Sequence, residues 1–300
     1  MKYTVFKGLF IFSLWPQWVL ACDGDCGSRW ALLDPKGPIA AHEKGLIITA
    51  FALMLLVVIP VIFMTVAFAW KYRASNKKAQ YAPNWDNSHK IEAVVWAVPA
   101  VIVAILAALV WKSSHELNPY RPIQSAAKPV QVQVVSMNWK WLFIYPELGI
   151  ASVNRLVIPA GVPVSFKITS DAVMSSFFIP QLGGQIYAMA GMQTRLQLVA
   201  DQPGSYQGLN TQFNGDGFAG MHFETVAASS QDFESWVAQV KHGATPLNET
   251  TFKALEIPSE NVSPRYFSSV EPQLFERILQ KYLPNAEAGQ TGRHGMTPAM

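Results

Sequence analysis

Cysteine is almost absent from this 300-residue chain: there are only two, Cys22 and Cys26, both near the N-terminus. The segment 130–228 therefore contains no thiol, and its single histidine is His222. A copper centre of the electron-transfer kind needs thiolate and imidazole ligands that converge on the metal. The composition of this segment thus excludes such a centre.

Charged residues are also scarce, at 14% of the chain, and the net charge is only +3. No basic stripe interleaved with aromatic residues is present, so nothing supports a nucleic-acid partner. Nor does the sequence hold a nucleophile–base constellation, a zinc-spaced cluster or a Gly-rich phosphate loop. We therefore expect no catalytic centre in this chain alone. Half of its residues are hydrophobic, which favours a membrane protein.

The N-terminus has the pattern of an export signal. Lys2 and Lys7 precede an apolar stretch at 8–20 that is too short to span a bilayer, so residues 1–21 are predicted to be a signal peptide. It ends in Val-Leu-Ala before Cys22, which resembles the lipobox of bacterial prolipoproteins and implies lipidation of Cys22. Asp23 resembles the residue that retains such lipoproteins in the inner membrane. A disulfide between Cys22 and Cys26 is the alternative, and the sequence assigns no other role to Cys26.

Two uncharged stretches follow, at 46–69 and 93–111, and each is long enough for a transmembrane helix. Pro60 and Pro99 lie inside them, where neighbouring helices must satisfy the carbonyls that proline leaves free. The two spans are therefore expected to pack against a larger membrane partner.

Charge asymmetry gives the orientation. The loop at 70–92 is basic, whereas the segment at 22–45 balances its charges, so the loop is predicted to be cytoplasmic. The basic residues of the loop are Lys71, Arg73, Lys77, Lys78 and Lys90. The N-terminal segment and everything after the second span are then periplasmic, in a two-pass protein of the bacterial inner membrane.

After a linker at 112–129, short β-type runs recur between Gly, Pro and Asn breaks. They lie at 131–136, 139–145, 153–158, 162–169, 193–200, 205–213 and 221–227. This spacing predicts a Greek-key β-sandwich over 130–228.

The pattern then becomes helical and aromatic-rich over 229–283. Ser229 and Asp232 resemble a capping box, and a second helix is expected over 272–283. Residues 284–300 form a polar tail that is predicted to be disordered. The fold class is a membrane-anchored α+β protein, with a helical hairpin, a periplasmic sandwich and a short helical C-terminal region.

The order of these parts resembles subunit II of the haem-copper respiratory oxidases, over about residues 22–283. The particular motifs are Ile91-Glu92 with Trp96 and Pro99, the aromatic run at 137–141, and Ser-Phe-Phe-Ile-Pro at 176–180. The phrases at 186–192 and 218–221 are similar to the bo-type ubiquinol oxidase branch. The resemblance implies a cupredoxin-like sandwich.

In the branch that oxidises cytochrome c, this subunit holds two coppers through a histidine before a Ser-Phe pair and a C-x3-C-x3-H-x2-M loop. The matching positions here are predicted to be Ser175, Asn214, Phe218, His222 and Thr225. Only His222 keeps its ligand type, and a single imidazole cannot hold two coppers. We interpret His222 as a surface side chain of the sandwich.

Without copper, the resemblance implies a different electron donor, because cytochrome c delivers its electrons to that centre. Ubiquinol dissolves in the bilayer and could reduce a haem in subunit I directly. The expected partners are therefore subunit I, the other oxidase subunits and membrane lipid, with haem b, haem o and copper all in subunit I. This chain would be a non-redox subunit of a proton-pumping oxidase that reduces O2 to water, and would support its assembly.

Glu92, Trp139 and Trp141 each have a functional and a purely structural interpretation. In similar subunits, the glutamate that matches Glu92 lies near the entrance of a proton channel of subunit I, although a first-turn carboxylate also favours a helix N-terminus by under ~1 kcal/mol. Trp139 and Trp141 match the run through which copper-containing relatives receive electrons. With no copper to serve, we interpret them as packing residues.

Two other functions remain open. One is a membrane-anchored, copper-handling module that uses methionines, although Met174, Met189, Met192 and Met221 lie among apolar neighbours, where filling a core is their usual role. The other is a cytochrome c oxidase subunit, which would require copper binding without thiols.

Overall fold

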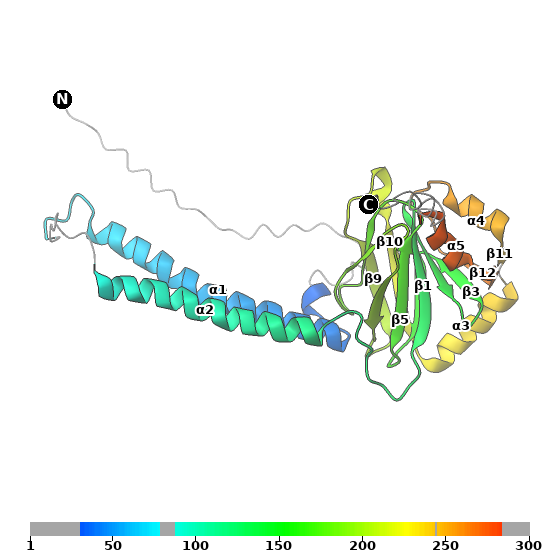
Figure 1. Ribbon diagram of the computed structural model, residues 1–300, viewed down its shortest axis with the longest axis horizontal. Helices are drawn as coiled ribbons and strands as arrows, with labels where there is room; N and C mark the ends of the chain where they lie inside the picture. The colour runs from blue at the N-terminus through cyan, green and yellow to red at the C-terminus, as the bar shows by residue number, and fades with distance from the viewer. Residues whose placement is uncertain (1–30, 79–87, 244, 284–300) are drawn as a thin grey trace, which may run out of the picture.

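The computed structural model describes residues 31–78, 88–243 and 245–283. Four predictions lie outside these residues: the signal peptide, lipidation at Cys22, the alternative disulfide to Cys26, and the disordered tail. In the described part, a hairpin of two long helices projects from a β-sandwich that carries three shorter helices (Figure 1).

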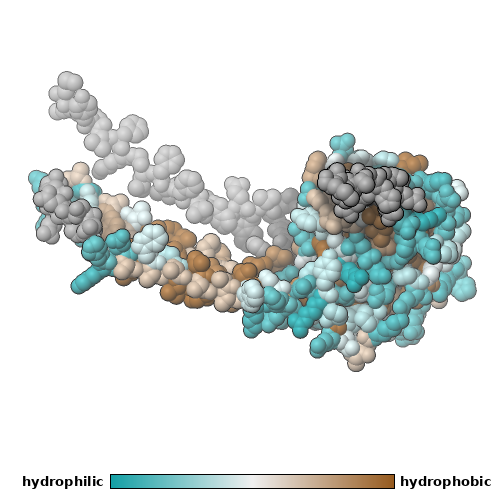
Figure 2. Space-filling view, viewed as in Figure 1, coloured by the Kyte–Doolittle hydropathy of each residue, from teal (hydrophilic) through white to brown (hydrophobic). Residues whose placement is uncertain are grey.

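The hairpin consists of α1 (Pro38–Lys71) and α2 (His89–Glu116). Both are long and apolar enough to cross a membrane, with mean hydropathy windows of 3.0 and 2.8. Their side chains are almost all exposed, and they form an apolar rod beside the polar surface of the sandwich (Figure 2). Both helices extend beyond the predicted spans, because hydropathy detects only the apolar part of a helix that continues through charged residues such as Lys44 and Glu92.

The sandwich consists of two sheets, which confirms the predicted architecture. The larger sheet has the order β11-β12-β3-β2-β1-β5-β8, and the smaller has the order β4-β10-β9-β6-β7. The strands of the larger sheet are β1 (Val130–Met137), β2 (Lys140–Tyr145), β3 (Ile150–Val153), β5 (Val164–Ser170), β8 (Thr194–Leu198), β11 (Thr245–Leu247) and β12 (Arg265–Val270). Those of the smaller sheet are β4 (Arg155–Pro159), β6 (Ser175–Phe178), β7 (Ile186–Ala188), β9 (Gly204–Asn210) and β10 (His222–Ala228).

Each of the seven predicted runs contains a strand, but β3, β6 and β7 were not predicted. The run at 153–158 does not continue as one strand, because Asn154 adopts a left-handed conformation (φ 55°). This turn moves the chain from β3 in the larger sheet to β4 in the smaller one. The strands β6 and β7 are only 4 and 3 residues long, too short to show a clear period.

The main core lies between the two sheets and is rich in aromatic side chains. Phe177 of β6 stacks on Phe223 of β10, with ring centroids 5.1 Å apart, and Trp141 of β2 meets both rings edge-on. Phe223 lies opposite Gly208 in the antiparallel pair of β9 and β10. A Cβ atom at position 208 would overlap the Phe223 ring, so glycine is required for this aromatic packing.

A second core covers the other face of the larger sheet. Successive side chains of β1 and β2 point to opposite faces of the sheet. Val134 and Phe143 therefore lie in the first core, and Val135 and Leu142 lie in the second. The C-terminal region packs on this outer face, through residues such as Phe275.

The two helices predicted within 229–283 are confirmed, but the region also contains elements that were not predicted. The region contains α3 (Ser230–Gly243), α4 (Glu249–Glu256) and α5 (Leu274–Lys281), but β11 and β12 extend the larger sheet. β12 pairs with β3, which is more than 100 residues earlier in the chain, so this strand depends on a tertiary partner. The predicted cap is confirmed, since Ser229 Oγ accepts a hydrogen bond from the Asp232 amide at 3.1 Å.

The segment before α1 attaches the hairpin to the sandwich. The Lys36 amide donates to the Gln181 carbonyl at 2.7 Å, and the Lys36 carbonyl accepts from the Asp201 amide at 2.8 Å. A Cβ atom at Gly37 would collide with the Val199 carbonyl, so position 37 requires glycine. Ile39 then packs against the main core, which ties the first turn of α1 to the sandwich.

A buried lysine attaches α4 to the sheet. Lys140 of β2 is only 1% exposed, and its ammonium donates to the carbonyls of Leu255 and Ile257 at 2.8 and 2.7 Å. These carbonyls lie at the C-terminal end of α4, where the helix dipole favours a cation. Burial lowers the pKa of Lys140, and the nearby charge of Arg265 lowers it further.

We expect Lys140→Met to destabilise the protein by about 1.5–3 kcal/mol, because it removes charge-assisted hydrogen bonds from two carbonyls at a largely buried helix end. Thermal unfolding followed by circular dichroism would measure the loss. Lys253→Met is the control, since Lys253 is an exposed residue of the same region whose ion pair is with Glu249, within α4. Equal stability of the two variants would contradict the role given to Lys140.

Candidate functional site

The predicted ligand positions come together only in part. Ser175 is buried at the start of β6, and the Asn214 side-chain amide donates to its hydroxyl at 3.1 Å. His222 is exposed at the start of β10, as predicted for a surface side chain. Thr225 is buried further along β10, where it pairs with Tyr206 of β9. The structure therefore joins Ser175 and Asn214 but gives His222 and Thr225 no hydrogen bond to them.

Two residues that were not predicted complete the cluster. The Asn210 carboxamide oxygen accepts from the Ser176 amide at 2.9 Å, and its nitrogen lies 3.4 Å from the sulfur of Met221. The Asn214 nitrogen lies 3.1 Å from the same sulfur. We call Ser175, Asn210, Asn214 and Met221 the polar cluster.

The polar cluster favours a different register for the predicted ligand positions. Positions 210, 214, 218 and 221 have the same x3, x3, x2 spacing as the copper-binding loop, four residues earlier than predicted. In this register, Asn214 matches the second cysteine of the copper-binding loop and Phe218 matches its histidine. Met221 matches its methionine. The match of Met221 by residue type was the signal that could have found this register in the sequence.

The cluster does not fit a binuclear copper centre. It offers one hydroxyl, two carboxamides and a thioether, whereas such a centre needs thiolates and imidazoles. Across residues 31–78, 88–243 and 245–283, no three His, Cys, Asp or Glu side chains come together as a metal site. The cluster is instead held by its own hydrogen bonds between β6, β9 and the loop that leads to β10.

Trp139 holds that loop in place. Its indole nitrogen donates to the Asn214 carbonyl at 3.2 Å, and its ring covers Gly217 in the short helix η2 (Asp216–Gly220). A side chain at Gly217 would collide with this ring. Trp141, by contrast, is fully buried in the main core.

Glu92 lies in the first turn of α2, in an exposed position. Its carboxylate is 3.5 Å from the Nδ1 atom of His89, and the two side chains are 60% and 89% exposed. An exposed carboxylate at this end of the hairpin is accessible to protons from solvent. The same geometry also suits a simple helix-capping charge.

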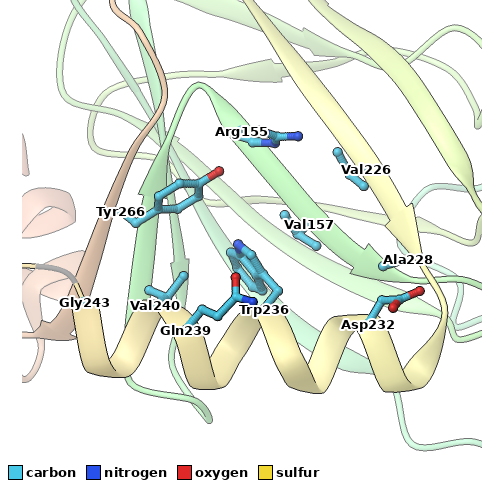
Figure 3. Close-up of a pocket in the computed structure, with 10 residues that line it drawn as sticks. All are labelled: Arg155, Val157, Val226, Ala228, Asp232, Trp236, Gln239, Val240, Gly243 and Tyr266. Carbon is cyan, nitrogen blue, oxygen red and sulfur yellow. The ribbon is translucent and has the colours of Figure 1, made fainter.

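The sandwich has a cavity of about 540 Å³ under α3, between this helix and strands β4 and β10 (Figure 3). Arg155, Asp232 and Gln239 contribute polar groups to it, and Arg155 pairs with Glu224 at 3.3 Å. The Trp236 ring lines the cavity with Tyr266, which it meets edge-on, and it also meets the buried Tyr145 ring edge-on. The lining contains no histidine or cysteine, and the sequence pattern singled out only one of its residues, Asp232, as part of a helix cap.

Two family profiles match this chain. Residues 146–227 match the periplasmic domain of cytochrome c oxidase subunit II, and residues 241–285 match the COX aromatic-rich motif. The periplasmic domain of subunit II of cytochrome oxidase from Bradyrhizobium japonicum aligns at 22% identity over 39% of this chain and 98% of that chain, with a TM-score of 0.37. A similarity of this size adds nothing to the family assignment.

Similarity to complete sequences is much stronger. Cytochrome bo(3) ubiquinol oxidase subunit 2 of Pseudomonas aeruginosa is 54% identical over 96% of this chain and 85% of its own length. Ubiquinol oxidase subunit 2 of Acetobacter aceti is 50% identical over 85% of this chain and 84% of its own length. Since these alignments include the hairpin as well as the sandwich, the chain belongs to the family of subunit 2 of the cytochrome bo(3) ubiquinol oxidases.

Proposed function

We propose that this chain is the non-redox subunit of a terminal ubiquinol oxidase that reduces O2 to water and pumps protons. The observation that carries the proposal is the polar cluster, which occupies the copper-loop spacing with side chains that cannot build the copper centre. The family assignment supports it, because the similar proteins are named as ubiquinol oxidase subunits.

The polar cluster bears on which molecule donates electrons to the oxidase. A soluble cytochrome would need a metal in the sandwich to receive its electron, whereas ubiquinol is already in the membrane. We propose that ubiquinol is oxidised in the complex and that haem b, haem o and copper lie in subunit I. The sandwich then serves as a scaffold for assembly.

The placement in the membrane has two supports. The hairpin is apolar and exposed, so it needs lipid or other helices around it, and subunit I is the proposed neighbour. The basic residues between the helices favour a cytoplasmic loop, with the sandwich in the periplasm. We propose the bacterial inner membrane, with lipid on Cys22 as an additional anchor.

A copper-handling module is the alternative of a different class. Met174 and Met192 are exposed, but Met221 is buried and its sulfur lies beside the Asn210 and Asn214 amides. This arrangement favours packing over metal transfer.

Purification in mild detergent tests the function directly. An optical spectrum of the purified material should show haem that co-purifies with this chain, because the chain is held in an oxidase complex. A preparation free of any chromophore would favour the binding module, and a near-infrared copper band would favour a cytochrome c oxidase subunit.

The role of Glu92 is tested by Glu92→Ala. If its carboxylate helps protons enter the complex, turnover and proton uptake should fall severalfold while haem content stays normal. Glu276→Ala is a matched control, because Glu276 is an exposed first-turn carboxylate of α5. Unchanged turnover in a fully assembled Glu92→Ala complex would leave Glu92 as a helix-capping charge.

Trp139→Leu separates packing from electron transfer. Losing the indole hydrogen bond and the cover over Gly217 should cost about 1–3 kcal/mol of unfolding free energy. The rate of haem reduction by ubiquinol should not change, as measured by stopped-flow absorbance. Phe213→Leu alters a 70% exposed ring in the same loop and should affect neither quantity. A selective loss of haem reduction in Trp139→Leu would contradict the packing role.

A further inference from the structure

A cavity of about 230 Å³ lies where the two helices meet the sandwich. Its walls come from the first turn of α1, the end of α2 with the turn that follows, and strand β8. The residues that matter for binding are Glu116, Asn118, Arg121, Gln124 and Gln197, and the apolar part of the wall includes Ile39. The lining is therefore mixed, with both charge signs beside apolar groups.

The depth of this cavity in the membrane follows from the helix geometry. Trp111 is 73% exposed at the end of the apolar part of α2, where aromatic residues mark the edge of the hydrocarbon. Glu116 lies five residues further, or about 7.5 Å along the helix axis. The headgroup layer on each side of a bilayer is roughly 5–8 Å thick. The cavity thus lies at the level of the lipid headgroups.

The two charged groups in the cavity are complementary to a zwitterion. The Arg121 guanidinium can form a fork of hydrogen bonds to a phosphate, and the Glu116 carboxylate can accept from an ammonium group. Within the described part of the chain, Arg121 has no carboxylate within 4.0 Å, and the only ion pair of Glu116 is a long one to Lys112, at 3.9 Å. Both groups are therefore available to a ligand.

The wall is also rigid. After α2 ends, the Arg121 amide donates to the Asn118 carbonyl at 2.9 Å, and the Asn118 side chain accepts from the Tyr120 amide at 2.9 Å. Gln197 is held on the other side by a hydrogen bond to Ser165 at 2.9 Å. A site that is already ordered loses less entropy when it binds.

The size of the cavity limits what it can hold. Pockets that enclose a whole small molecule usually measure about 300–1,000 Å³. At 230 Å³, this one fits one end of a molecule whose remainder lies elsewhere. A phospholipid meets this condition, because its acyl chains stay in the bilayer beside the apolar helices.

We propose that this cavity binds the headgroup of a phosphatidylethanolamine molecule, with the phosphate on Arg121 and the ammonium on Glu116. The inference rests on the membrane placement proposed above. A lipid held there would fill the angle between the hairpin and the sandwich and would stabilise their relative orientation.

Native mass spectrometry of the delipidated oxidase complex tests the proposal. The complex is titrated separately with short-chain phosphatidylethanolamine, phosphatidylglycerol of the same chain length, and inorganic phosphate. Arg121→Gln should weaken binding of both lipids by roughly tenfold, the size expected for losing a charge-assisted hydrogen bond. Glu116→Gln should weaken binding of phosphatidylethanolamine alone, because phosphatidylglycerol has no ammonium group.

Arg73→Gln is the matched control, since Arg73 is an exposed arginine at the opposite end of the hairpin. It should leave binding of both lipids unchanged. Equal binding of phosphatidylethanolamine to the parent and Arg121→Gln complexes would overturn the proposal. Saturation by inorganic phosphate at the same concentrations would also overturn it, by showing a site for free anions.

Two further measurements separate lipid binding from effects on assembly of the complex. If Arg121→Gln lowers the haem content, Arg121→Lys replaces it, and the loss of the fork should still weaken lipid binding. The same titration on the isolated full-length chain tests lipid binding by itself. The proposed function is tested separately, by haem content and ubiquinol oxidation. Lipid selectivity in the isolated chain would stand even if no haem co-purified.

Discussion

The structure depends on the burial of β1 and β2 on both faces. Side chains at alternate positions of these strands enter two different cores, so the larger sheet must be covered on each side. The smaller sheet covers one face, and the C-terminal region covers the other. Lys140 shows how strict this constraint is, because a charged side chain on the second face is buried and must find its partners in α4. The C-terminal region is therefore an integral layer of the fold.

Aromatic packing and side-chain hydrogen bonds hold the loop before β10 in its shape. Trp139 covers the glycine-rich loop before β10, and the carboxamides of Asn210 and Asn214 hold the neighbouring strands through hydrogen bonds. Directed polar contacts therefore link β6, β9 and the loop. Such a scaffold suits the proposed role in an oxidase that takes its electrons from the membrane, and the junction with the hairpin holds the proposed lipid site.

Sequence reasoning succeeded where the signal was local and failed where it was tertiary. The two apolar stretches, the sandwich and the cap at Ser229 all follow from patterns within a few residues of one another. The predicted register of the ligand loop depends on His222, which matches a ligand by type, whereas the polar cluster favours a register four residues earlier. Asn210 carries no such signal in the sequence, and its place in the cluster is visible only once β6, β9 and the loop are brought together. β12 was missed for a similar reason, since its partner β3 is distant in the chain.

Composition and periodicity alone determined that this protein has two helices apolar enough to cross a membrane and a β-sandwich segment without a thiol. Those properties depend on which residues are present and on their local spacing. Tertiary structure decided which polar side chains converge, which strand joins which sheet, and that Arg121 and Glu116 line one cavity. These outcomes depend on contacts between residues far apart in sequence, whose geometry is set by the packing of both cores.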